Sequence, residues 1–435
     1  MSSPVFRRIS APTSLQIEVT SFCNAKCKHC YNGLMDGSFP RFMMSEEIAN
    51  GIWQEIFDNQ VRQIILTGGE PLLNWPITKF FMEKGRDYYY KVRMNSNVAL
   101  LTDEIADELK ELRINGISAS LMSSTPKIHD KIAGVRGLCK KTIAGIELCL
   151  KKEIPVCVNM VLSKYNVHDI SNTVSFLAKL GVKNISLTPA SCPSRGLDFS
   201  MKTLTQDEIL EVYNLTAKYS KEYNVQISPA DAVPFCVMPK LSHGVIPSFF
   251  CAAGLSGAYV DPLGNLRACP LMTKTYGSII EEPLTKVWPR LQDDWLKAQC
   301  VSKKCLNCKL FGDCGGGCHY LAQLNGGEHP LMDIELVDET EQILLDLHHD
   351  EIEHPVEIPK DGTFKLKPFT IRKENFGAII WNELSTTELM VYRSSLVFLT
   401  SLLVDVPYKV SSVVTEENRD LFYDLYLNGF VTFEE

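Results

Sequence analysis

The chain lacks any uninterrupted apolar run long enough to cross a bilayer, and its first eight residues lack the apolar stretch of a secretion signal. We therefore expect neither a membrane protein nor an exported one, and predict a cytoplasmic location. A basic surplus is also missing, since 44 Lys and Arg face 52 Asp and Glu for a formal net charge of −8. This balance argues against a general nucleic-acid binder. Internal repeats and low-complexity tracts are absent as well.

Fifteen cysteines are present in a chain of 435 residues, which is too long for a single hydrophobic core. A disulfide scaffold needs an oxidising compartment, and nothing in the chain points to one. The cysteines gather at 23–30 and at 251–318, which favours metal or cluster ligation. Cys139, Cys149 and Cys157 are expected to be small buried hydrophobic residues.

Short β-rich segments alternate with helix-length segments up to about residue 230. Six such units in a row predict an α/β fold with a parallel sheet, curved as a full or partial barrel, and ligands at the carboxyl ends of the strands. The predicted strands are 15–20, 61–67, 91–96, 116–122, 155–162 and 182–189, and the predicted helices are 45–57, 77–84, 103–112, 141–152, 168–180 and 206–223.

Cys23, Cys27 and Cys30 follow the first predicted strand with gaps of three and two residues. Three thiolates at this spacing can hold three irons of a cubic cluster and leave the fourth open to S-adenosylmethionine (SAM). Gly68-Gly69-Glu70 closes the second strand, where glycines allow a close backbone approach and a buried Glu can accept hydrogen bonds from an ammonium group. Together these motifs resemble the radical SAM family.

The resemblance implies a partial (β/α)6 barrel of the TIM type, a [4Fe–4S] cluster and bound SAM. In that family the Gly-Gly-Glu segment holds the amino group of SAM, which implies the same for Gly68, Gly69 and Glu70. Family segments at the ends of the third and fourth strands imply further SAM contacts at Asn95, Ser120 and Arg136. The acid that the family usually has after Ser120 is replaced by Met122, so we assign no catalytic residue.

A second group of cysteines follows the barrel. A Cys-x2-Cys pair alone fits a zinc site, but the whole arrangement resembles the SPASM domain of peptide-modifying maturases, which carries two auxiliary iron–sulfur clusters. The resemblance implies a first cluster on Cys251, Cys269 and Cys318 and a second on Cys305, Cys308 and Cys314.

The last cysteine of the SPASM pattern is missing, since no cysteine occurs after Cys318. The fourth ligand of each cluster is therefore open. Cys236 is the spare thiol expected for the first cluster. For the second, the alternatives are Cys300, an oxygen or nitrogen ligand such as Asp333 or His319, or an open iron.

The remaining chain divides into an acidic helix and linker at 331–361 and a small α+β domain at 362–435. Segments 376–382 and 388–393 predict a β-hairpin, and helices over 395–403 and 416–427 with a closing strand predict a winged helix. This part resembles the precursor-peptide recognition (PqqD-like) domain of pyrroloquinoline quinone and mycofactocin biosynthesis. That implies an exposed strand edge for a leader peptide, with Lys365 and Lys367 beside acidic leader residues; a winged-helix dimerisation or capping module is the alternative.

We therefore predict a radical SAM core at 1–230, a SPASM domain at 231–330, and a maturase that takes hydrogen from a ribosomally made precursor peptide. The product would be an oxidative C–C, C–S or C–O crosslink or a decarboxylation. Partners would be the precursor peptide and an electron donor such as flavodoxin or ferredoxin, without nucleic acid or membrane. The alternatives are a sulfatase-type or small-molecule radical SAM dehydrogenase and a zinc-organised winged-helix binding protein.

Overall fold

The computed structural model divides into two compact units, one of residues 1–84 and 92–345 and one of residues 85–91 and 346–435. In the part of the chain that it describes, no helix has the length and apolar character to span a membrane. Cys192 and Cys300 lie outside the described residues. The described ranges are 8–32, 40–191, 202–242, 251–296, 302–344, 362–383 and 387–433.

The larger unit is built on a nine-stranded sheet with the strand order β7-β6-β5-β4-β3-β2-β1-β8-β9. Strands β3 to β7 pair in parallel, β1 pairs in parallel with β2 and β8, and β9 returns antiparallel to β8. The strands are β1 (Ser14–Glu18), β2 (Gln63–Thr67), β3 (Lys91–Ser96), β4 (Gly116–Ser120), β5 (Val156–Leu162), β6 (Asn184–Pro189), β7 (Gln226–Pro229), β8 (Gly257–Val260) and β9 (Leu266–Arg267).

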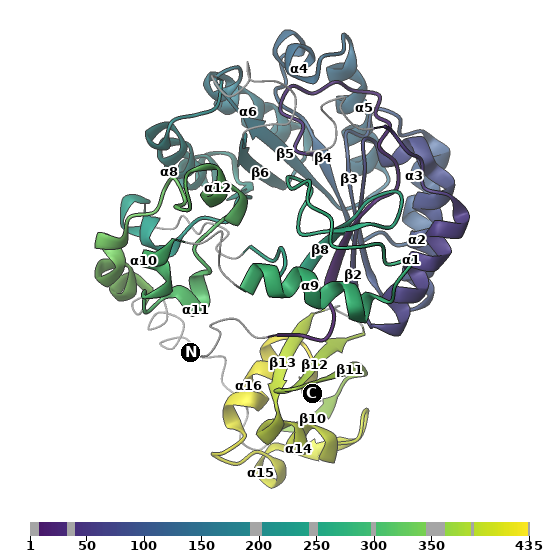
Figure 1. The fold of residues 1–435 in the computed structure, drawn as a ribbon, viewed down its shortest axis with the longest axis vertical. Coiled ribbons are helices and arrows are strands. Elements are labelled where there is room, and N and C mark those ends of the chain that lie inside the picture. The colour runs from purple at the N-terminus through teal and green to yellow at the C-terminus, as the bar shows by residue number, and fades with distance from the viewer. Residues whose placement is uncertain are drawn as a thin grey trace. The chain divides into compact units, whose positions relative to one another are not determined.

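Helices between the strands cover the outer face of this sheet (Figure 1). Three of these helices begin with a side-chain cap: Ser45 and Thr102 each accept a backbone hydrogen bond, and Thr205 forms a capping box with Glu208. They are α1 (Glu46–Asp58), α2 (Trp75–Asp87), α3 (Asp103–Glu111), α4 (Pro126–Ala133), α5 (Leu138–Lys151), α6 (Ile170–Leu180) and α8 (Gln206–Tyr223), with short helices η1 (Pro71–Asn74) and η2 (Val167–Asp169).

The six predicted strands are confirmed, each within two residues at either end. The sheet is larger than the six-unit prediction, because β7 extends one edge and the β8–β9 hairpin extends the other. Strands β7 and β8 have only four residues each, which is too few for an alternating pattern to stand out. Helix α4 was not predicted either, because its eight residues are too few for a clear helical pattern.

Side chains of the strands alternate between the helix-covered face and the interior of the curved sheet. On β5, Val156, Val158, Met160 and Leu162 are buried, and the residues between them are half-buried. Period-two alternation gives each strand one row of side chains toward the helices and one toward the interior. The inner row, including Asn159, forms the wall of the cavity described below.

The Cys-rich region after β7 contains little regular structure. Its helices are η3 (Phe235–Lys240), α9 (Leu284–Leu296), α10 (Lys303–Leu306), α11 (Phe311–Cys314), α12 (His319–Leu324) and η4 (Ile334–Leu336).

The smaller unit contains two antiparallel three-stranded sheets, β14-β10-β15 and β11-β12-β13. The predicted β-hairpin is confirmed as β12 and β13. Residues 364–371 alternate apolar and polar residues but belong to two different sheets, because the ladder breaks at Pro368, which has no N–H to donate. The elements are β10 (Thr363–Leu366), β11 (Phe369–Glu374), β12 (Gly377–Asn382), β13 (Glu388–Tyr392), α14 (Arg393–Ser401), β14 (Pro407–Lys409), α15 (Val410–Val413), α16 (Arg419–Leu427) and β15 (Val431–Phe433).

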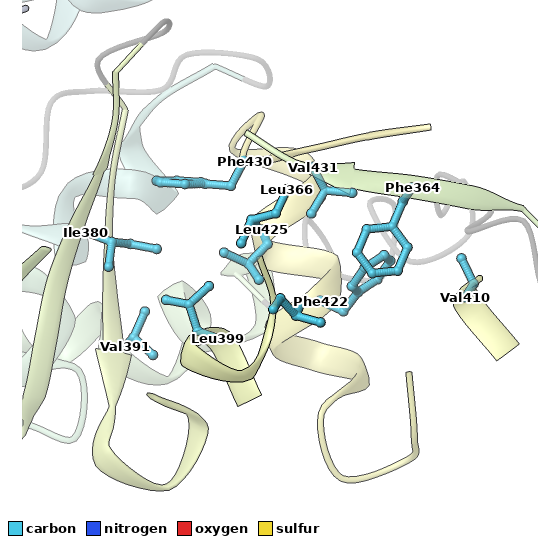
Figure 2. Close-up of a cluster of buried hydrophobic side chains, with 11 residues drawn as sticks. Phe364, Leu366, Ile380, Val391, Leu399, Val410, Phe422, Leu425, Phe430 and Val431 are labelled. Carbon is cyan, nitrogen blue, oxygen red and sulfur yellow. The ribbon is translucent and has the colours of Figure 1, made fainter. Parts of the chain in front are cut away.

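A hydrophobic cluster joins both sheets and the helices of the smaller unit (Figure 2). The rings of Phe364 and Phe422 meet edge to face, with centroids 4.7 Å apart, which is a favoured aromatic geometry. Phe430, Ile380 and Leu399 are also completely buried. The smaller unit therefore has its own core. Lys365 lies on β10, the middle strand of its sheet, which pairs with β14 and β15.

Candidate functional site

A cavity of about 430 Å³ lies at the carboxyl ends of the parallel strands in the larger unit. In parallel α/β sheets this edge is where ligands bind, because the loops after the strands converge there. Of the predicted site residues, the cavity is lined by Cys23, Cys27, Cys30, Gly68, Gly69, Asn95 and Ser120.

The loop that carries Cys23, Cys27 and Cys30 leaves the end of β1 and is held from two sides. The Lys26 N–H donates to the Ala133 carbonyl (2.9 Å) and the Lys28 N–H to the Ile132 carbonyl (3.0 Å), both at the end of α4. On the other side, the Asn97 side-chain amide donates to Asn24 Oδ1 (2.7 Å). The loop is therefore positioned by its neighbours, and its three thiols line the same cavity.

Gly68 and Gly69 allow the end of β2 to approach this loop closely. The Gly69 N–H donates to the Thr20 carbonyl (2.6 Å), and the Glu70 N–H donates to the Phe22 carbonyl (2.8 Å). A Cβ atom at Gly68 would lie 2.4 Å from the Thr20 carbonyl oxygen, and one at Gly69 would lie 2.2 Å from that of Phe22. No side chain fits at either position without moving the cysteine loop.

Glu70 is completely buried behind the cavity. Its carboxylate accepts hydrogen bonds from the Ser96 hydroxyl (2.7 Å), the Asn97 N–H (2.9 Å) and the Leu72 N–H (3.1 Å). Burial raises the pKa of Glu70, and these three donors oppose that rise. Glu70 thus holds the end of β3, where Asn95, Ser96 and Asn97 line the cavity. Its contact with SAM stays a prediction.

The residues after β4 divide into a cavity wall and an exposed position. Ser120, Met122 and His129 line the cavity, and the Met122 N–H donates to His129 Nδ1 (3.1 Å). Burial lowers the pKa of His129 to about 4, which keeps the ring neutral with its proton on Nε2. Arg136 is exposed and does not line the cavity, so its predicted SAM contact remains a prediction.

Cys251, Cys269 and Cys318 form one neighbouring set. Cys251 precedes β8 and Cys269 follows β9, so the hairpin brings them together, and Cys318 joins them from the start of α12. Burial, and then a neighbouring thiol of the set, raises the pKa of each cysteine: Cys251 and Cys269 to about 11, and Cys318 to about 12. Pro270 and Leu271, directly after Cys269, line the same cavity as Cys23.

Cys305, Cys308 and Cys314 form the second set, and Cys236 lies with them. Burial, followed by the neighbouring thiols of Cys314, Cys236 and Cys308, raises the pKa of Cys305 to about 12. Cys236 was expected to join Cys251, Cys269 and Cys318, but it lies with Cys305, Cys308 and Cys314, and the cluster that it would ligate stays a prediction. Cys236 is nearer in the chain to Cys251 but folds against the later segment.

Two other predicted ligands already have partners. The Asp333 carboxylate pairs with Lys240 Nζ (2.8 Å), and His319 Nε2 lies 2.9 Å from the Gly315 carbonyl oxygen. Within the described ranges, no group of three or more His, Cys, Asp or Glu side chains is close enough to hold one metal ion. A single zinc needs its ligands to converge at about 2.0–2.3 Å, whereas a cluster spreads its thiolates over several irons. Thiolate donor sets such as these suit iron–sulfur clusters.

Several residues of the cavity were not found from the sequence. Asp231 follows β7 and is the carboxylate among the described cavity-lining residues, and burial raises its pKa to about 7. Tyr31 lies beside Cys30 and shares a hydrogen bond with Thr67 Oγ1 (2.8 Å). Asn159 and Thr188 line the cavity from β5 and β6. Thr188 lies near the end of β6 and Asp231 just after β7, so position at a strand end was the available signal for these two, and for Asp231 it was lost with β7.

The chain resembles known proteins in sequence and in fold. Residues 17–177 match the family model of the radical SAM superfamily. The AdoMet-dependent heme synthase of Methanosarcina barkeri is 26% identical over 325 residues, which cover 69% of this chain and 92% of that protein. The antilisterial bacteriocin subtilosin biosynthesis protein AlbA of Bacillus subtilis is 26% identical over 337 residues, covering 73% of this chain and 69% of AlbA.

Among solved structures, Streptococcus suis SuiB bound to precursor peptide SuiA superposes with a TM-score of 0.61 at 18% identity, over 75% of this chain and 76% of SuiB. At this identity the similarity concerns the fold. The family match, by contrast, spans the segment that contains both the three-cysteine loop and Gly68-Gly69-Glu70. Residues 17–177 therefore form a radical SAM domain, and the chain is an enzyme that uses a [4Fe–4S] cluster and SAM.

Proposed function

We propose that this enzyme modifies a peptide oxidatively, with a core cluster on Cys23, Cys27 and Cys30 and two auxiliary clusters in the Cys-rich region. The observation that carries the proposal is the cavity itself. Its wall contains the core cysteine loop and also Pro270 and Leu271, which follow Cys269 far later in the chain. One cavity therefore contains the core cysteine loop and the two residues next to Cys269, which suits an oxidation in which an auxiliary cluster accepts the second electron.

When bound, the core cluster and SAM supply reductive cleavage of SAM to methionine and a 5′-deoxyadenosyl radical. The chain's own residues bind and orient SAM. Gly68 and Gly69 expose backbone at the cavity wall, and Asn95 and Ser120 offer polar side chains from the next two strands. Glu70 keeps the end of β3 in place through Ser96 and the Asn97 N–H.

A crosslink or decarboxylation also needs a proton acceptor at the substrate. Asp231 is proposed for this role because it lies in the cavity wall, at the end of β7. Its pKa of about 7, raised by burial, suits a group that exchanges protons near neutral pH. The domain limits proposed for this enzyme are 1–230 for the core, 231–330 for a SPASM domain and 331–361 for the linker.

The smaller unit is proposed to bind the leader segment of the precursor peptide, as a winged-helix, PqqD-like domain at 362–435. An extended peptide binds by adding main-chain hydrogen bonds to an edge strand. The edges are β11 and β13 in one sheet and β14 and β15 in the other. Lys365 lies on a strand paired on both sides, so its backbone cannot receive the leader, and an edge strand such as β13 takes that role.

Two relatives support the proposed peptide substrate. AlbA is named for bacteriocin biosynthesis, and SuiB was solved with a precursor peptide. The heme synthase relative favours the second candidate, a small-molecule substrate in the same cavity. The free cysteines of the described residues suit a reducing compartment, which supports the proposed cytoplasmic location and an electron donor of the flavodoxin or ferredoxin kind.

The proposal is tested with anaerobically reconstituted protein, dithionite and SAM. The wild type should form 5′-deoxyadenosine and Cys27→Ala should not, with Cys149→Ala as a matched control that removes a buried thiol from α5. Peptides encoded by small reading frames next to the gene should then lose the mass of two hydrogens, or of carbon dioxide and two hydrogens. Equal 5′-deoxyadenosine from wild type and Cys27→Ala would reject the core assignment. Binding and turnover of a porphyrin but of no such peptide would favour the small-molecule candidate.

A further inference from the structure

Cys236 is buried in η3, which begins four residues after the cavity residue Asp231. Its sulfur accepts a hydrogen bond from the Asp333 N–H (3.2 Å). A buried thiol with a backbone donor is suited to ligate as a thiolate, because the donor stabilises negative charge on sulfur. The position of Asp333 also places this sulfur beside the later Cys-rich segment.

Three further contacts locate Cys236 within the second cysteine set. The N–H of Phe235, its chain neighbour, donates to Cys314 Sγ (3.2 Å). Met332, the neighbour of Asp333, has its sulfur 3.3 Å from Cys305 Sγ. Cys308 packs with Cys305, Phe311 and Met332 in one small hydrophobic cluster. Cys236 thus lies next to Cys314 on one side and, through Met332 and Asp333, next to Cys305 on the other.

We propose that Cys236 is the fourth thiolate of the second auxiliary cluster, with Cys305, Cys308 and Cys314. This assignment rests on the proposed function, since it needs the auxiliary clusters to exist. It replaces the missing cysteine after Cys318 with one that precedes the whole Cys-rich segment. Four thiolates are the usual complement of a [4Fe–4S] cluster without an open iron. The first auxiliary cluster then has three cysteine ligands within the described residues, which are Cys251, Cys269 and Cys318.

A ligand at this position also has a structural consequence for the cavity. The segment from Asp231 to Cys236 is bonded to the Cys-rich region elsewhere, since the Cys318 N–H donates to the Ala232 carbonyl (2.8 Å). A Cβ at Gly317 would lie 2.8 Å from the Pro234 ring, so the two segments are in close contact. A cluster held by Cys236 ties the end of β7, and with it Asp231, to the auxiliary region.

The assignment is tested by iron content in full-length protein whose core cluster has been removed by Cys23→Ala, Cys27→Ala and Cys30→Ala together. This parent should hold about eight irons, four for each auxiliary cluster. Adding Cys236→Ala should lower the iron and sulfide content by up to half, or leave a three-iron cluster with its own EPR signal. Adding Cys149→Ala, a buried thiol outside both sets, or Cys300→Ala should leave content and spectrum unchanged.

A Cys236→Ser variant separates ligation from folding, because a serine oxygen can replace the thiolate and shift the spectrum while the fold is kept. A shifted spectrum with the melting temperature of the parent supports the assignment. Unchanged iron and spectra in both Cys236 variants overturn it, as does a loss caused by Cys300→Ala instead. Iron loss with a collapsed fold in both Cys236 variants also counts against it, because a ligand replaced by serine should retain the fold. A parent without iron refutes the auxiliary clusters themselves and this assignment with them.

Discussion

Glu18 on β1 and Arg267 on β9 form an ion pair that is almost completely inaccessible to solvent, with exposures of 1% and 0%. Arg267 Nη2 lies 3.4 Å from Glu18 Oε2, and the Tyr259 hydroxyl donates to the same oxygen at 2.7 Å. The Asn32 amide donates to Oε1 at 3.0 Å. The guanidinium also lies over the Tyr259 ring, 4.4 Å from its centroid, and donates to the Met272 carbonyl at 3.0 Å.

Replacing Arg267 by Met should destabilise the larger unit strongly. Removing one partner of a buried pair leaves an uncompensated charge and typically costs about 3–5 kcal/mol. The lost hydrogen bond to the Met272 carbonyl adds about 1–3 kcal/mol for the acceptor left without a donor. Burial is the largest influence on Glu18 and raises its pKa to about 7. Protonation of Glu18 can relieve part of the cost, so we expect about 3 kcal/mol at neutral pH.

The measurement is urea unfolding of the apo protein followed by tryptophan fluorescence. The matched control is Arg290→Met, because Arg290 pairs with Glu282 at the surface, where both side chains are more than two-fifths exposed. An exposed pair contributes about 0–1 kcal/mol. The double variant Glu18→Gln with Arg267→Met should recover part of the loss, because no buried charge remains. Equal costs for Arg267→Met and Arg290→Met would refute the reasoning.

Three further predictions concern the cavity. Gly69→Ala should prevent assembly of the core cluster while the protein still folds, because its Cβ meets the Phe22 carbonyl oxygen, and iron analysis with circular dichroism checks both. Glu70→Gln should weaken SAM binding about tenfold or more, as measured by calorimetry. The amide NH2 of glutamine must then face the N–H of Asn97 or of Leu72, which leaves a buried donor without an acceptor and costs about 1–3 kcal/mol. The folded pKa of His129, lowered by burial to about 4, lies below its unfolded value of 6.5, so the unfolded state binds more protons between them. Stability of the apo protein should therefore fall as the pH drops from about 6.5 to 4, by up to about 1.4 kcal/mol per pH unit, and His129→Gln should flatten this slope; an identical slope in the variant would exclude His129 as its source.

The parallel core and its cluster loop could be predicted because their signals are local. A strand of five to seven residues, a cap such as Ser45 and the spacing of Cys23, Cys27 and Cys30 can each be read within a few positions of the chain. Gly68 and Gly69 were also readable, and the contacts with Thr20 and Phe22 give the physical reason for both glycines. Short elements gave no such signal, and β7 with Asp231 was missed for that reason.

Pairings between distant segments required the folded chain. The thiols that lie near Cys236 depend on how η3 folds against residues 305–333, whereas chain order alone favoured Cys251, Cys269 and Cys318. The same holds for Glu18 and Arg267, which are 249 residues apart and meet only because the β8–β9 hairpin adds to the edge of the sheet at β1. Residue type and spacing specify the chemistry that a segment can perform, because ligation and backbone conformation depend on near neighbours. Which segments share a cluster or a buried charge depends on long-range packing, which no local pattern encodes.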